Sequence, residues 1–469
     1  MLYIIFIFLS LFIFNYSIDF DANKIEELDD MIKTQMKDAK LDTFGLVIIS
    51  NSSIPYKKVF GDKGYDINSH FVIGSVTKSF TALSILQLNI SLNDTLEHFG
   101  LSDYLDDNLL KEITVGELLN HTSGLDSSSG KKVGKSGEFR YSNYGYGLLG
   151  KIIKNKSGKS YKEYVKENIF DKLDMKNSGA EYKDDIIDSY TNFFGFRTKY
   201  GGLESDYDKK DGFDIPAGFI YSTIDDMSKY LKFYLDEKNY DKYVSKMTEP
   251  TIKILYNMYY GMGMFVRFKD KMKYFEHLGQ VSTFLSHLYV YPDLDLAFFY
   301  FTNTVDPLCN VPYSQFATNL ENLILSSPYD TVNSSLFFHV HFSIDLIILI
   351  IIAIPLTYLI ITIIRKIKKE KPTWFDGIKG KIIFGVDVFL LIILPIIILI
   401  IFYVSGLKSL VNSSLDIAFA LLTTTISMMV NFVLKLGYFF LYKKFIDKDD
   451  NSKLGKILEP LDMNNMSSE

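Results

Sequence analysis

Three long apolar segments near the end of the chain constrain its fold more than any other feature. They cover Ile344–Ile364, Ile382–Val404 and Leu415–Leu441. Each has at least the roughly 20 residues that a helix needs to cross the hydrocarbon core of a bilayer. The sequence therefore predicts three transmembrane helices within 344–442, followed by a tail over 443–469.

Basic residues indicate how these helices are oriented. Seven Lys and Arg residues lie between Arg365 and Lys381, whereas the loop Gly406–Ser414 carries only Lys408. Short loops rich in Lys and Arg stay on the cytosolic side of a membrane. We therefore expect the first loop and the C-terminal tail in the cytosol. The part before Ile344 is then lumenal, in the secretory pathway, or extracellular.

The first residues agree with this orientation. The apolar run Leu2–Phe14 is typical of the hydrophobic core of a signal peptide, although no basic residue precedes it. Residues 1–17 are therefore expected to be a signal peptide or an uncleaved signal anchor, and both place 18–330 across the membrane. Six Asn-x-Ser/Thr sequons on that side are candidate glycosylation sites: Asn51, Asn89, Asn93, Asn155, Asn333 and Asn412.

Composition and isolated charges narrow the function classes further. The net charge of −6, without a long block of one sign, argues against a nucleic-acid partner. Cys309 is the only cysteine, so the chain forms no internal disulfide and no cysteine-based metal site. Charges in or beside the apolar segments raise transport as a function. We interpret them instead as groups near the membrane interface: Asp345, Asp387, Asp416 and Lys435.

Between 18 and 330 the sequence predicts an α+β fold. Apolar residues recur at helical spacing over Asn23–Lys37, and two strands, Phe44–Ser50 and Tyr56–Phe60, follow. A helical, loop-rich middle extends over 90–240. Helix first, then antiparallel strands, indicates a mixed fold with an antiparallel sheet. Strand character returns at Tyr259–Phe268, Lys273–His277, Phe284–Tyr291 and Leu296–Phe301.

Ser75 and Lys78 are the candidate nucleophile and base. A Ser-x-x-Lys pair on a helix puts both side chains on one face, one turn apart. A lysine whose pKa is lowered by burial or by nearby cations can take the proton of the hydroxyl. Only Ser75 is followed by an apolar helical run, VTKSFTALSILQL. The same pattern without such a run occurs at Ser128–Lys131, Ser129–Lys132 and Ser405–Lys408.

Two further patterns complete a candidate site. Tyr141 and Asn143 form a Tyr-x-Asn turn before a Gly/Leu-rich helix, and they supply a phenol for proton relay and an orienting amide. The similar Tyr190–Asn192 lacks such a helix. His277 and Gly279 lie on a late strand, where a cationic or hydrogen-bonding ring would face the cleft. A single histidine there is more often structural, but the three patterns together favour catalysis.

With these motifs the chain resembles the serine β-lactamase and penicillin-binding-protein superfamily, and specifically its class C β-lactamase-related branch. The resemblance covers about Lys24–Ser326. It implies an antiparallel sheet flanked by helices and an all-helical subdomain. It extends beyond the three motifs to Phe71–Leu83, Ile113–Leu125, Ile215–Leu231 and the hairpin that ends at Phe301–Asn303.

The resemblance also implies acyl transfer without a metal or cofactor. Ser75 would attack a carbonyl, while Lys78 and Tyr141 share proton transfer and Asn143 positions them. His277 would stand beside the leaving or recognition group. The backbone N–H groups of Ser75 and of Gln280, next to Gly279, would form the oxyanion hole. His121, Ser123 and Gly124 are interpreted as structural turn residues.

The chain departs from the family pattern beside Gly279. Leu278 stands where the family often has a small or hydroxylated residue, and Gln280, Ser282 and Thr283 replace common glycines. A hydroxyl at the middle position helps to bind a substrate carboxylate. Its loss indicates a different ester or amide substrate, or an inactive homologue.

The leading hypothesis is a membrane-anchored serine hydrolase that acts on a small-molecule or peptide amide or ester, with the lipid bilayer as its other partner. An inactive ectodomain used as a binding module is the alternative. Ser75, Lys78, Tyr141 and Asn143 argue against it, because a binding module does not need all four. A transporter is the third hypothesis, and three helices without an evident polar core argue against it.

Overall fold

The computed structural model describes residues 18–193, 196–208, 212–269, 271–281, 283–305, 310–326, 334–368, 370, 372–375, 377–397, 400 and 415–457. It divides into two compact units. Unit 1 is Met1–Asn192 with Phe196–Phe338, and unit 2 is Phe193–Gly195 with His339–Glu469. The expected signal segment, the end of the tail, Cys309, Asn333 and Asn412 lie outside the described residues.

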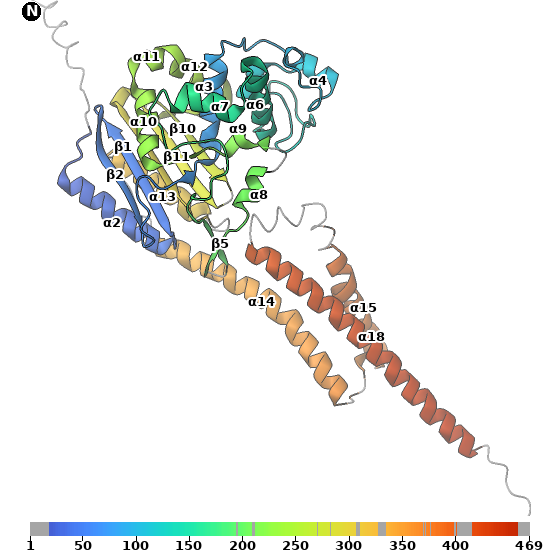
Figure 1. Ribbon diagram of the computed structural model, residues 1–469. Coiled ribbons are helices and arrows are strands. Elements are labelled where there is room, and N and C mark those ends of the chain that lie inside the picture. The colour runs from blue at the N-terminus through green and yellow to red at the C-terminus, as the bar shows by residue number, and fades with distance from the viewer. Residues whose placement is uncertain are drawn as a thin grey trace, which may run out of the picture. The chain divides into compact units, whose positions relative to one another are not determined.

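Unit 1 is built around an eight-stranded antiparallel sheet (Figure 1). The strand order is β2-β1-β12-β11-β10-β9-β8-β7. β1 pairs with β12, with Phe44 opposite Thr302 and Ser50 opposite Leu296, so the two ends of the domain meet inside the sheet. The strands are β1 (Thr43–Ser50), β2 (Ser53–Gly61), β7 (Ile252–Leu255), β8 (Met258–Tyr260), β9 (Phe265–Lys269), β10 (Met272–Val281), β11 (Phe284–Tyr291) and β12 (Leu296–Thr302).

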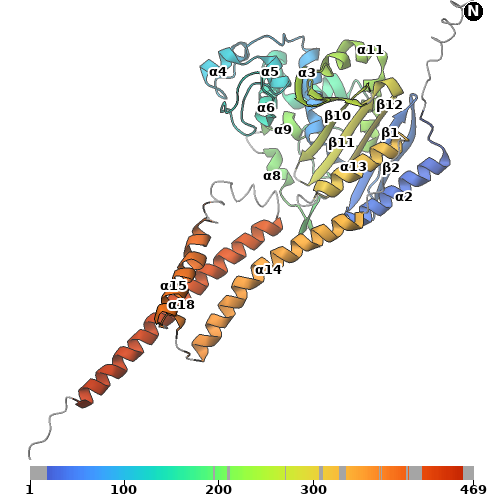
Figure 2. The ribbon, with the colours of Figure 1, turned by 180° about the vertical axis from the view of Figure 1, so that it is seen from behind.

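Helices cover both faces of the central strands. Every residue of β1, β11 and β12 is buried, which explains why these strands read as continuous apolar runs instead of alternating ones. One face carries α2 (Ala22–Asp38) and α13 (Asn310–Ile324), as Figure 2 shows from behind. The other face carries α10 (Ile224–Leu235) and α3 (Thr77–Gln87).

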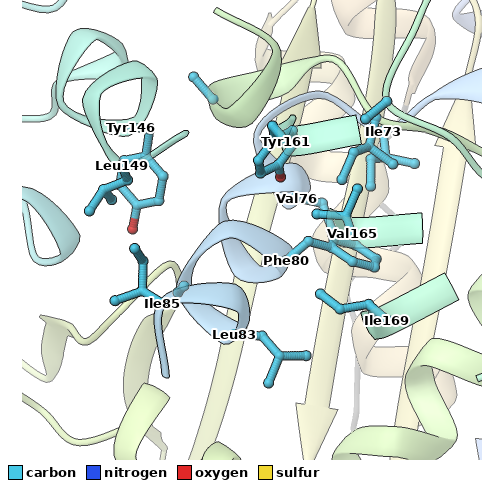
Figure 3. Close-up of a cluster of buried hydrophobic side chains, with 14 of the residues drawn as sticks. Ile73, Val76, Phe80, Leu83, Ile85, Tyr146, Leu149, Tyr161, Val165 and Ile169 are labelled. Carbon is cyan, nitrogen blue, oxygen red and sulfur yellow. The ribbon is translucent and has the colours of Figure 1, made fainter. Parts of the chain in front are cut away.

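The helical part of unit 1 packs on α3, which is buried along nearly its whole length. Figure 3 shows Val76 and Phe80 of this region beside Tyr161, Val165 and Ile169. This apolar surround holds the start of α3 rigidly. The other helices are α4 (Asp107–Glu112), α5 (Val115–Leu119), α6 (Asn143–Ser157), α7 (Tyr161–Val165), α8 (Leu203–Asp208), α9 (Ile215–Gly218), α11 (Glu237–Asn239) and α12 (Ser245–Met247).

A short sheet fixes the segment before α3. β3 (Phe71–Val72) pairs with β6 (Tyr221–Ser222), and the backbone N–H of Ile73 donates to the carbonyl of Ile220 at 3.0 Å. Two of the stretches that carry the family resemblance are therefore joined directly. A second short sheet contains β4 (Tyr190–Phe193) and β5 (Phe196–Lys199).

The structure confirms the expected α+β fold with its antiparallel sheet and helices. It differs in several stretches: β4, β5 and β6 lie in the region expected to be helical and loop-rich, β7 was not expected, and β10 extends beyond the expected Lys273–His277. Strand character over Tyr259–Phe268 divides into β8 and β9, because the chain turns between them at Gly261–Met264. Gly263 has φ +72°, and a Cβ there would lie 2.6 Å from the carbonyl oxygen of Lys78. The turn is therefore packed against the helix that carries the candidate base.

Unit 2 contains three helices long and apolar enough to cross a membrane: Leu346–Ile367, Gly377–Ile397 and Phe419–Lys444. They belong to α14 (Ser334–Ile367), to α15 (Gly377–Val388) with its continuation, and to α18 (Leu415–Ile457).

The interpretation of charges near the interface is wrong for Asp387 and Lys435, which lie well inside their segments. The Asp387 carboxylate accepts from Lys435 Nζ at 2.8 Å and from Tyr358 Oη and Trp374 Nε1, both at 2.7 Å.

Candidate active site

Ser75 lies in a single 3₁₀ turn, Gly74–Val76, immediately before α3. It is the one partly exposed residue between Phe71 and Phe80, and the rest of this stretch is buried. The nucleophile candidate is thus presented at the surface by a rigid, apolar support. This context separates Ser75 from the other Ser-x-x-Lys patterns.

Lys78 is completely buried, in the first turn of α3. Its Nζ lies 3.1 Å from Ser75 Oγ, 2.7 Å from Asn143 Oδ1 and 2.6 Å from the carbonyl oxygen of Ala217. The third contact comes from α9 and was not predicted from the sequence. A contact through a backbone carbonyl does not depend on the side chain of Ala217, so the residue type gives no signal for it. Only the family resemblance of the stretch that begins IPAG pointed to this part of the chain.

These contacts suit a neutral amine. Burial lowers the pKa of Lys78 well below its usual range, although Asp214 opposes the shift. A neutral amine has two N–H groups and one lone pair. The carbonyl groups of Asn143 and Ala217 can accept both hydrogens, which directs the lone pair to the Ser75 hydroxyl. The geometry is that of a base prepared to receive the serine proton.

Tyr141 lies beside both Ser75 and Lys78. Burial raises the pKa of its phenol, against a hydrogen bond with Ser75 that lowers it. The phenol therefore keeps its proton at neutral pH. Its ring centroid is 4.7 Å from Lys78 Nζ. Tyr141, Ser75 and Lys78 thus form one connected group through which a proton can pass.

Asn143 begins α6, whose N-terminus is capped by Ser142. The Ser142 hydroxyl accepts from the backbone N–H of Gly145 at 3.1 Å. This cap fixes the first turn and aims the Asn143 amide at Lys78. Tyr190, from the similar pattern, instead hydrogen-bonds Asp188 and Lys63.

His277 lies on β10 and is buried, with both ring nitrogens engaged. Nδ1 lies 2.7 Å from the carbonyl oxygen of Leu278, and Nε2 lies 3.1 Å from Tyr260 Oη. Burial, with help from Lys78, lowers the pKa of His277 to about 3. The ring is therefore neutral and hydrogen-bonding, and its contacts do not support the cationic alternative.

Two glycines bring β10 against the Ser75 turn. Gly74 has φ +56°, and a Cβ there would lie 2.5 Å from the backbone nitrogen of Gln280. A Cβ on Gly279 would lie 2.1 Å from the carbonyl oxygen of Ile73. The space beside Gly279 is thus filled by the protein itself. The close approach brings the backbone of Gln280 beside the turn that carries Ser75, as an oxyanion hole requires.

The contact of Gly74 with Gln280 was not predicted from the sequence. The only signal for it was the presence of a glycine directly before the serine. His121 was expected to be a turn residue, and it has φ +62°. It also packs on Tyr141, with ring centroids 4.3 Å apart, and accepts from the backbone N–H of Ser142 at 3.2 Å. Its Nε2 is buried and has no hydrogen-bond partner among the described residues.

The remaining candidates fall outside this group. The Ser128 and Ser129 hydroxyls both donate to Asp126, and Lys132 pairs with Glu112. Within the described part of the chain, no group of three or more His, Cys, Asp or Glu side chains is arranged to hold a metal ion. The described sequon asparagines are all exposed: Asn51, Asn89, Asn93 and Asn155.

Comparisons with known proteins agree with the fold and the motifs. The family described as Beta-lactamase matches residues 28–313. Protein flp of Staphylococcus aureus (strain MW2) is 24% identical over 310 residues, which cover 57% of this chain and 60% of that protein. Beta-lactamase-like protein 2 of Dictyostelium discoideum is 29% identical over 254 residues, 45% of this chain and 46% of that protein. The chain therefore spans only part of each relative.

A solved structure is similar as well. The octameric penicillin-binding protein homologue from Pyrococcus abyssi superposes with a TM-score of 0.56 at 26% sequence identity. The similarity covers 65% of this chain and 78% of the other. The matched family region extends over more than half of the sequence and contains the sheet, α3 and the group around Ser75. On this basis the chain belongs to the beta-lactamase family.

Proposed function

We propose that the protein is a membrane-anchored serine hydrolase that works through an acyl-enzyme. The observation that carries the proposal is the environment of Lys78. Its nitrogen is fully buried and contacts Ser75 Oγ, and two carbonyl oxygens accept hydrogen bonds from it. A buried amine in this arrangement is a general base for a serine nucleophile.

The reaction would run in two halves. The Ser75 proton passes to Lys78 as Oγ attacks the substrate carbonyl, and the backbone N–H groups of Ser75 and Gln280 bind the resulting oxyanion. The leaving group then takes a proton from Lys78 through Tyr141, which leaves an ester on Ser75. Water attacks this ester and gives a proton to the same pair, which returns it to Ser75 Oγ as the acyl bond breaks. The products are the acid and the free hydroxyl of Ser75.

Sequence features support a substrate that differs from a β-lactam. The Tyr141–Asn143 and His277–Gly279 motifs favour the class C-related branch. Leu278 offers no hydroxyl for a substrate carboxylate. It also lies on the opposite face of β10 from His277, because neighbouring residues of a strand alternate. We therefore propose a small-molecule or peptide amide or ester as substrate.

The charge distribution of unit 2 supports an extracytosolic site. Lys and Arg residues gather between the first two candidate spans, within Arg365–Lys381, and indicate that this loop is cytosolic. Residues before the first span are then lumenal or extracellular. The hydrolase unit would act there, tethered to the bilayer.

A serine-reactive fluorophosphonate probe tests the proposed nucleophile in the full-length protein. We expect covalent labelling of the native chain and its loss in Ser75→Ala. Ser128→Ala is the matched control, because it removes the serine of a Ser-x-x-Lys pattern that lies outside the site. Labelling that persists in Ser75→Ala, or a native chain that is not labelled, would refute the proposal.

A further inference from the structure

A second cavity lies on the face of the sheet opposite Ser75. It has a volume of about 460 Å³, is open to solvent on one side and is lined by β9 to β12 and by α13. Figure 2 looks onto this face, where α13 lies over the sheet. Glu276, Leu278 and Gln280 line the cavity, whereas His277 and Gly279, between them on β10, face the Ser75 turn. The proposed hydrolysis makes no use of this cavity.

One wall of the cavity holds an ionised carboxylate that is already satisfied. Glu276 Oε1 accepts from Arg267 Nε at 2.6 Å, and Oε2 is bonded to His287 Nε2. Burial alone would raise the pKa of Glu276, but His287 and Arg267 lower it to about 2. Glu276 therefore fixes the position of the arginine and is not itself available to a ligand.

Arg267 has unused donors that face this cavity. A guanidinium carries five N–H groups, and only its Nε is engaged among the described residues. The side chain is 37% exposed, so its outer edge is accessible. A planar guanidinium edge binds a carboxylate with two parallel hydrogen bonds.

Another element that lines the cavity offers a carboxylate. Glu321, on α13, accepts a hydrogen bond from Tyr291 Oη at 2.6 Å. No basic side chain of the described residues lies within ion-pair distance of it. Between the two charged groups the lining is aromatic and apolar, and includes Tyr274, Tyr289 and Leu285. The cavity thus offers guanidinium donors at one place, an unpaired carboxylate at another and an apolar body.

We propose that this cavity binds a small zwitterion with an apolar or aromatic body, such as a free amino acid or a short peptide. The ligand carboxylate would lie on Arg267 and its ammonium group on Glu321. The volume is within the range of small-molecule sites, about 300–1,000 Å³. Two carboxylates in the lining, Glu276 and Glu321, disfavour a dianion such as phosphate.

Calorimetric titration of the full-length Ser75→Ala protein in detergent tests this site without any contribution from hydrolysis. The ligands are phenylalanine, the dipeptide phenylalanylalanine, N-acetylphenylalanine and phenylalanine amide. We expect at least one of the first two to bind. Removal of either charge from the matching amino acid should weaken binding about tenfold or more, because the ligand loses its charged hydrogen bonds to Arg267 or to Glu321. Equal affinity for all ligands, or no binding by either zwitterion, would overturn the proposal.

Two substitutions assign the ends of the ligand. Arg267→Gln should abolish the preference for phenylalanine over its amide, and Glu321→Gln should abolish the preference over the N-acetyl form. Arg197→Gln is the control, because this arginine pairs with Asp42 away from the cavity. Ala317→Trp fills the cavity without removing a charge and should block binding. Thermal unfolding establishes that each variant is folded, and preferences unchanged in both Gln variants would contradict the site.

Discussion

Lys78 is fully buried, and the carbonyl oxygens of Asn143 and Ala217 lie within hydrogen-bond distance of its nitrogen. An amine buried in this way is a stronger candidate for a base than any exposed lysine, because burial lowers its pKa and so favours its neutral form. The buried position of Lys78 thus prepares it to accept the proton of Ser75 in the proposed reaction. His277, also buried and neutral, is suited to hold β10 and Tyr260 in place.

The pH dependence of acylation should report Lys78. We expect the acylation rate by the fluorophosphonate to fall as pH drops through the lowered pKa of Lys78, since the protonated amine cannot accept the serine proton. The midpoint should lie well below 10.5. The rate of the His277→Gln variant should show the same midpoint, because the pKa of His277 is about 3 and the ring stays neutral throughout.

Lys78→Arg is the sharper variant, because a guanidinium remains charged at all accessible pH values. Its acylation should be slower by about 10²–10⁴-fold, the usual contribution of general-base catalysis. Lys131→Arg, in the exposed loop, should leave the rate unchanged. Rapid acylation of Lys78→Arg would show that another group takes the proton.

The lowered pKa of Lys78 also means that the folded state gains stability as pH rises toward 10.5.

At the scale of elements, β10 and its neighbours organise the hydrolase unit. Successive residues of β10 point to the Ser75 turn and to the second cavity in alternation. In unit 2 the corresponding organising feature is the Asp387 carboxylate. It accepts hydrogen bonds from Tyr358, Trp374 and Lys435. Residues from all three apolar helices and from the loop between the first two meet at this one group.

The pair of Asp387 and Lys435 should contribute strongly to the stability of unit 2. Lys435→Met leaves the carboxylate without its counter-charge and should destabilise by about 3–5 kcal/mol. Asp387→Leu with Lys435→Met should cost less than the sum of the single changes. Unfolding in mixed detergent measures these differences, with the exposed Lys443→Met as control. Additive effects in the double variant would show that the two groups act separately.

The sequence predicted those elements that are determined by residues close to one another along the chain. Phe284–Tyr291 forms β11 with the expected bounds, because an apolar run between turns needs no further information. Ser75, Lys78, Tyr141 and Asn143 were placed together because their motifs have local signals. The Ala217 carbonyl, the Gly74 contact with Gln280 and the Asp387–Lys435 pair could not be found, since each depends on segments that meet only in three dimensions.

At the scale of the whole molecule, the two units of the chain expose different kinds of surface. Unit 1 has a polar surface around its buried sheet, and unit 2 exposes apolar side chains along all three of its long helices. An exposed apolar surface of this kind is stable in lipid and not in water. The proposed location of unit 1 on the lumenal or extracellular side rests on the charges between the candidate spans.

That assignment predicts glycosylation of unit 1. When the full chain is expressed in a eukaryotic cell, treatment with peptide N-glycosidase should increase its electrophoretic mobility. Replacement of the exposed asparagines by glutamine should remove the shift: Asn51, Asn89, Asn93 and Asn155. Asn465→Gln, in the expected cytosolic tail, should have no effect. An untreated chain that already migrates like the enzyme-treated one would contradict the orientation.

The pairing of β1 with β12 has a consequence for biosynthesis. Phe44 meets Thr302, so the ribosome must add more than 250 residues after β1 before its partner exists. Contacts between such distant segments form slowly, because a long loop must close first. Strands β1 and β2 therefore remain without β12 until shortly before the candidate span that begins at Leu346 is synthesised. With the proposed membrane anchoring, completion of the sheet and entry of the first helix into the bilayer are nearly simultaneous events.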